Sequence, residues 1–119
     1  MGAISFAAEE AQEIARALAA VAAADGAILA REASLLDEFA VANGVGGHAW
    51  IAKPLDAGRL ARAVKDPEHR REVLRLCLRM AVADGEYAEA EQRTIARIAT
   101  AFEIGSDELL AMQRAAVGR

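Results

Sequence analysis

The sequence contains an internal repeat at an offset of 59 residues. The segment from Val21 to Gly26 ends in Ala-Asp-Gly, and the segment from Met80 to Gly85 ends in the same three residues. Downstream positions align as well: Glu32, Leu36, Phe39 and Val45 match Glu91, Ile95, Ile98 and Ile104. A repeat at a fixed offset indicates that one supersecondary unit is used more than once. We therefore expect two similar units, at about 6–45 and 65–104.

Both units have the periodicity of amphipathic helices. Apolar residues recur at spacings of three and four: Ile14, Leu18 and Val21 in the first unit, and Val73, Cys77 and Met80 in the second. The 31 Ala and only two Pro also favour helix over strand. The pattern predicts six helices, at 6–24, 30–43, 55–64, 67–83, 88–102 and 106–116. We expect them to form one compact all-α domain over residues 1–119, built from two repeated helical hairpins.

Capping residues support these helix ends. Ser5 and Ser106 are candidate N-caps, and Asp66-Pro67-Glu68 combines a cap, a first-turn proline and a first-turn acid. Glycines follow three of the predicted helices: Gly26, Gly44 and Gly85.

Composition excludes several functional classes. A net charge of -4 argues against a nucleic-acid binder that neutralises phosphates, although residues 53–79 have a net charge of +4. That basic middle either holds the domain together or steers a partner. The single cysteine, Cys77, favours a reducing compartment. No stretch of the sequence is long and apolar enough to span a membrane, and we expect no leader, so we expect a cytoplasmic protein. No nucleophile-base pair or phosphate-binding loop is evident, so we do not expect an enzyme.

Each unit contains Asp-Gly followed six residues later by Glu. The pairs are Asp25 with Glu32 and Asp84 with Glu91. This spacing matches the second half of an EF-hand calcium loop, but the two leading oxygen ligands are absent, so an EF-hand is not expected. Helical phase places all four acids at the ends of apolar stripes, toward the seams between helices.

Three interpretations of these acids remain open. Each Asp can accept backbone N–H bonds across its turn while each Glu lies in the favourable first turn of the next helix. Alternatively, Asp25, Glu32, Asp84 and Glu91 bind a divalent cation, although two carboxylates per corner are few for such an ion. They can also form one acidic surface for a basic partner. The first interpretation is favoured, and no other cofactor is expected.

The sequence resembles the TerB-like domain family, named for a tellurite-resistance protein and also found beside J-domains in membrane-anchored co-chaperones. The matching features are Ala24-Asp25-Gly26 with Glu32, Ala83-Asp84-Gly85 with Glu91, Asp66-Pro67-Glu68, and Phe102 to Ser106. The resemblance implies an all-helical domain with an acidic cluster and no settled catalytic activity. It also implies a link to stress response, to tellurite or metal resistance, and to membrane-associated assemblies.

Four further residues are candidates for contact with another protein or assembly. Trp50, the only tryptophan, lies in a Gly-rich connector and either anchors it to the core or contacts a partner. Arg71, Arg75 and Arg79 recur every four residues on one helix and form either a solvated face or a site for an anionic partner. The sequence also leaves a homodimer open. We expect His48 to be a loop residue and His69 a surface residue in a first helical turn.

Overall fold

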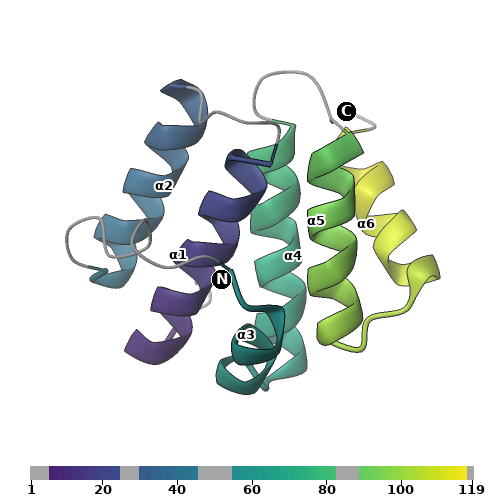
Figure 1. The fold of residues 1–119 in the computed structure, drawn as a ribbon, viewed down its shortest axis with the longest axis horizontal. Helices are drawn as coiled ribbons and strands as arrows, with labels where there is room; N and C mark the ends of the chain where they lie inside the picture. Colours follow the sequence, from purple (N-terminus) through teal and green to yellow (C-terminus); the bar gives the residue numbers. More distant parts are fainter. Residues whose placement is uncertain (1–5, 25–29, 46–54, 83–88, 118–119) are drawn as a thin grey trace.

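The computed structural model describes residues 6–24, 30–45, 55–82 and 89–117, and these residues form helices and their connections with no strand among them (Figure 1). The helices are α1 Ala8–Ala22, α2 Ala30–Asn43, α3 Ala57–Ala63, α4 Pro67–Ala81, α5 Glu89–Ala101 and α6 Ser106–Val117. Each boundary lies within two residues of the one that the sequence predicts, so the all-α prediction is confirmed. None of the described helices is both long enough and apolar enough to cross a membrane.

Helices α1 and α4 lie side by side at the centre of the bundle (Figure 1). Helix α2 packs on α1, while α5 and α6 pack on α4. The short helix α3 contacts both α1 and α5 and lies across the lower end of the bundle in Figure 1. The two central helices therefore position all the others.

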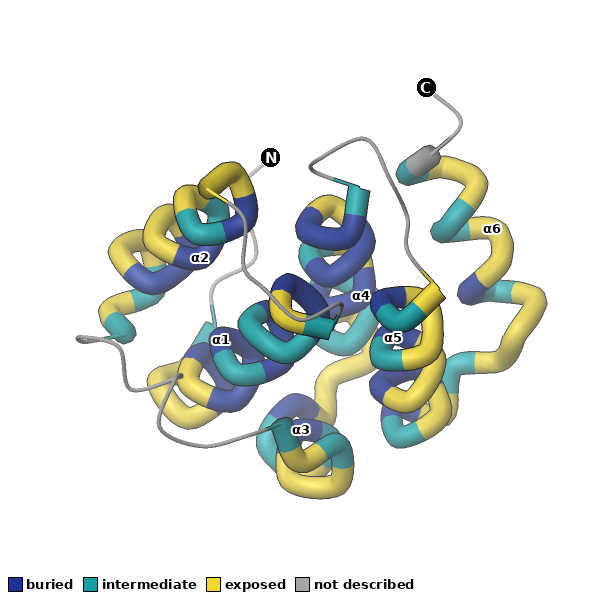
Figure 2. The backbone as a smooth tube through the Cα atoms, turned by 45° about the horizontal axis from the view of Figure 1, so that its top comes forward, coloured by how far each residue is buried: buried dark blue, intermediate teal, exposed yellow. Residues whose placement is uncertain are grey.

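The predicted apolar stripes form the core between these helices. Six stripe residues are at most 2% exposed: Ile14, Leu18 and Val21 in α1, and Val73, Cys77 and Met80 in α4. In Figure 2 the buried segments of α1 and α4, in dark blue, lie mainly on the sides that face neighbouring helices. Burial of each large apolar side chain contributes about 1.5 to 3 kcal/mol, so these stripes account for the central packing.

Helix α4 begins with the expected N-cap, whereas α6 does not. The Asp66 carboxylate accepts hydrogen bonds from the backbone N–H groups of Glu68 at 2.8 Å and His69 at 3.3 Å, and Pro67 begins α4. Ser106 is the first helical residue of α6 rather than its N-cap, because the Gly105 carbonyl accepts the Leu109 N–H at 3.0 Å. Ser5 lies outside the described residues.

The helix ends of the two repeat units have the same hydrogen-bond pattern. The Val45 N–H donates to the Ala40 carbonyl at 2.9 Å, and the Ile104 N–H donates to the Ala99 carbonyl at the same distance. Each turn contains a residue with positive φ, Gly44 at 71° and, 59 positions later, Glu103 at 61°. This geometry is the Schellman motif. Gly26 and Gly85 are outside the described residues, and superposition of the two complete hairpins remains a prediction.

Arg70 links three helices at the lower end of the bundle. Its guanidinium donates to the carbonyls of Val64 at 2.6 Å, Ala61 at 2.8 Å and Phe102 at 3.1 Å, and it lies 5.2 Å from the centre of the Phe102 ring. These carbonyls belong to the C-terminal ends of α3 and α5, where a positive charge is favourable. Arg70 therefore fixes both ends against α4.

We expect Arg70→Met to lower the free energy of unfolding by about 3 kcal/mol, because hydrogen bonds from a charged donor contribute about 1.5 to 3 kcal/mol each and do not add fully. Chemical denaturation of the purified chain measures this loss. Arg75→Met is the matched control, since Arg75 makes one exposed pair with Glu72, and it should cost less than about 1 kcal/mol. Equal losses in the two variants would contradict the role given to Arg70.

Candidate functional site

The structure places two of the four predicted acids in the interior. Glu32 and Glu91 lie in the first turns of α2 and α5, and each is only 2% exposed. They share a helix face with the buried residues Leu36 and Ile95, as their phase predicts. Neither glutamate lacks an interaction partner. The orientation toward the helix seams is therefore confirmed for these two acids.

The remaining parts of the predicted cation and partner sites are not described. Asp25, Asp84 and Trp50 lie outside the described residues, as does His48. Within the described part of the chain, no group of three or more His, Cys, Asp or Glu side chains is arranged to hold a metal ion. The cation interpretation therefore remains a prediction.

The three arginines of α4 have different surroundings. Arg71 donates to the carboxylates of Glu108 at 2.6 Å and Glu68 at 3.1 Å, and the hydrogen bond and charge of Glu108 raise the pKa of Arg71. Arg75 pairs with Glu72 at 2.9 Å. Arg79 is exposed and forms no ion pair with any described residue. Each step of four residues also rotates by about 40° around a helix, so the directions of Arg71 and Arg79 differ by about 80°.

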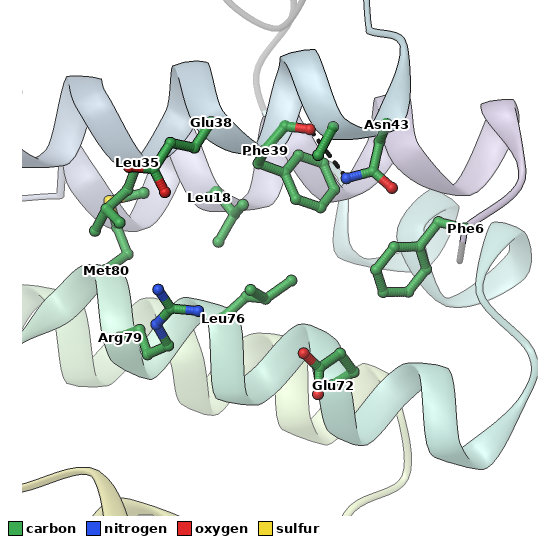
Figure 3. Close-up of a pocket in the computed structure, with 11 residues that line it drawn as sticks. Phe6, Leu18, Leu35, Glu38, Phe39, Asn43, Glu72, Leu76, Arg79 and Met80 are labelled. Atoms are coloured by element: carbon green, nitrogen blue, oxygen red, sulfur yellow. Dashed lines mark hydrogen bonds between the residues drawn. The ribbon is translucent and has the colours of Figure 1, made fainter. Parts of the chain in front are cut away.

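A groove opens between α2 and α4, and α1 also contributes to its lining (Figure 3). Its apolar lining comes from three helices: Leu35 and Phe39 of α2, Leu18 of α1, and Leu76 and Met80 of α4. Its polar lining residues are Glu38, Asn43, Glu72 and Arg79. The groove has a volume of about 240 Å³. It is an apolar depression whose charged groups are supplied by the two helices on either side.

An aromatic cluster closes one end of this groove. The Phe6 ring lies 6.1 Å from Phe39 and 5.3 Å from His69, which it meets nearly edge-on. His69 Nδ1 is 2.9 Å from Oε2 of Glu10, whose Oε1 accepts the Ala7 N–H and so caps α1. His69 lies in the first turn of α4 and its side chain is 25% exposed, as expected for a surface residue. Its ring also contacts Phe6 and the largely buried carboxylate of Glu10.

The sequence gives only a weak signal for this groove. Leu35 and Leu76 lie next to the main apolar stripes on their helices and are half-buried. An apolar stripe on a helix that is wider than the contact with its neighbouring helices indicates an additional contact surface. Periodicity does not say which helix or partner lies against that surface. The groove depends on the relative placement of α2 and α4, which only the three-dimensional structure provides.

Comparison with known proteins gives one match. A family model described as "Tellurite resistance protein TerB" matches residues 49–114, which is more than half of the chain. No curated protein and no solved structure matches. The matched region includes α4 and its side of the groove, while α1 and α2 precede it.

The contact with Glu10 should make part of the stability depend on pH. The hydrogen bond and charge of Glu10 raise the pKa of His69 above its usual 6.5. The resulting stabilisation is complete below the unfolded-state pKa of about 6.5 and disappears as the pH rises through the folded-state value. We expect Glu10→Gln to lower the pKa of His69 toward 6.5, as measured by NMR titration. The amide oxygen of Gln can still accept the Ala7 N–H.

Unfolding experiments at two pH values provide a second measurement. The stability difference between the wild type and Glu10→Gln should be larger at pH 6 than at pH 8.5, because only the protonated imidazole gains from the carboxylate charge. An equal difference at both values would show that Glu10 acts through the α1 cap alone.

Proposed function

Since the chain belongs to the TerB family, we propose that it is a non-enzymatic helical module that binds another protein in assemblies for stress, tellurite or metal resistance. The observation that supports binding is the groove between α2 and α4. An apolar depression with a few polar groups at its edge is typical of a recognition site. Its volume of about 240 Å³ is below the range of roughly 300 to 1,000 Å³ for small-molecule pockets, which favours side chains of a partner.

The surroundings of Cys77 support a non-enzymatic role. The thiol is fully buried, and desolvation raises its pKa to about 12. The thiolate is the reactive form of cysteine, and very little of it is present near neutral pH at this pKa. Cys77 thus acts as a core residue rather than as a nucleophile.

Affinity capture from extracts of cells that express the chain tests this proposal. We expect Leu76→Arg to reduce a specifically captured protein at least tenfold, because it places a charge on the groove wall. Val41→Arg is the matched control, since Val41 is also on the bundle surface, is 84% exposed and does not line the groove. Quantitative mass spectrometry measures the difference after both variants are shown to be folded. Identical capture by the two variants, or no specific capture by the wild type, would contradict the proposal.

A divalent-cation-binding domain is the alternative function. The observation that favours it is the burial of two carboxylates, Glu32 and Glu91, at 2% exposure, each seven residues after an aspartate in the sequence. This alternative needs Asp25 and Asp84 to supply further oxygen ligands, and two carboxylates at each corner are fewer than the six or more oxygens that calcium takes.

Thermal unfolding with and without Ca²⁺ or Mg²⁺ distinguishes the two functions. We expect no change in the melting temperature of the wild type, because local turn bonding explains the acids without an ion. A site saturated at a hundred times its dissociation constant would instead add about 2.7 kcal/mol, or roughly 10 °C. If such a gain occurs and is lost in the Asp25→Asn, Asp84→Asn double variant, the cation function would become the preferred one.

A further inference from the structure

We infer that the groove between α2 and α4 binds a single amphipathic helix of a partner protein, with an acidic side chain toward Arg79 and a basic side chain toward Glu38. This inference rests on the proposed binding function and specifies the chemistry of the partner. Its support comes from the length of the groove, the charges on its two walls, and the contacts of α3 in the other half of the bundle.

The groove has the length that a helical segment requires. On α2 its lining extends from Leu35 to Asn43, and on α4 it extends from Glu72 to Met80. At 1.5 Å per residue, each wall is about 12 Å long, which corresponds to roughly two helical turns. The anchors of a helix bound in a groove, at positions i, i+3 or i+4, and i+7, span a similar length. The volume is sufficient for a few such side chains and too small for a larger occupant.

The two walls present opposite charges. Arg79 lies on the α4 wall and Glu38 on the α2 wall, and Figure 3 shows them on opposite sides of the apolar floor. Both are exposed, and neither forms an ion pair with any residue in the described ranges. Glu72, by contrast, is paired with Arg75. A bound helix with an acid on one flank and a base on the other would complement both walls, and such complementarity discriminates against partners that would place like charges together.

The second repeat unit offers a comparison, because a helix covers the space that would correspond to the groove. Moved by 59 residues, α1 coincides with α4, and the start of α2 coincides with the start of α5. The predicted repeat would place the equivalent of the groove between α5 and α1, and α3 packs on both of these helices. Leu60 of α3 and the adjacent Val64 are completely buried. In this bundle, the space between α5 and α1 is thus covered by a short helix, α3, whose apolar side chains are buried.

A second copy of the chain fits the groove less well. A concave groove needs a protruding apolar ridge, and the large apolar side chains that are well exposed in the described ranges are Val41 and Leu110. They lie on different helices, α2 and α6, and so do not form a continuous stripe. This favours a partner of different sequence over self-association.

Selection from a displayed library of amphipathic helical peptides tests the inference with the intact chain. Wild-type protein should enrich helices that have an apolar stripe between an acidic flank and a basic flank. The Glu38→Arg, Arg79→Glu exchange variant should enrich the reversed arrangement, since both substitutions are on exposed residues that leave the core unchanged. We expect peptides selected on the wild type to bind the exchange variant at least tenfold more weakly. They should also lose binding to Leu76→Arg but retain it with Val41→Arg.

Several outcomes would overturn this inference. They are the absence of any enriched peptide, the same peptides enriched on both charge arrangements, and peptide binding that Leu76→Arg does not change. Self-association that Leu76→Arg abolishes, as measured by analytical ultracentrifugation, would assign the groove to a second copy instead. Cellular capture that depends on Leu76 would still support the proposed binding function if the peptide selection failed, so the two failures are distinguishable.

Discussion

The apolar contact between α1 and α4 is the interaction on which the positions of the other helices depend. Each helix is buried along one stripe, and residues such as Ile14 and Val73 are completely inaccessible to solvent. Helix α2 packs on α1 beside this contact, so α2 and α4 stand on either side of the same helix and leave the groove between them. The groove is therefore a consequence of the central packing. Its Leu18 floor belongs to the core as well as to the candidate site.

The contact between Glu10 and His69 relates the two halves of the chain. These residues occupy equivalent positions of the predicted repeat, 59 residues apart, and they hydrogen bond to each other at 2.9 Å. Here the two positions have complementary chemistry, since one is a carboxylate and the other an imidazole. This hydrogen bond therefore joins the first turn of α1 to the first turn of α4.

Local pattern was sufficient to predict the helices but not the contacts that connect them. Periodicity located all six helices, and helical phase predicted that Glu32 and Glu91 face the interior. The bonds of Arg70 to Ala61 and Phe102 were not predictable, because they join segments that only the packing brings together. The groove was missed for the same reason. A single sequence specifies which face of a helix is apolar, whereas the neighbour of that face depends on the arrangement of the whole bundle.

Part of the basic middle of the chain is used inside the domain. Arg70 binds backbone carbonyls, Arg71 binds Glu108, and Arg75 binds Glu72, so three of its cations have partners within the fold. This distribution supports the interpretation that the charge between residues 53 and 79 holds the helices together. Arg79 differs because it lies on the groove wall opposite Glu38, and none of the described residues pairs with it. Arg79 is therefore the cation of this region that lies on the groove between α2 and α4, where a partner could contact it.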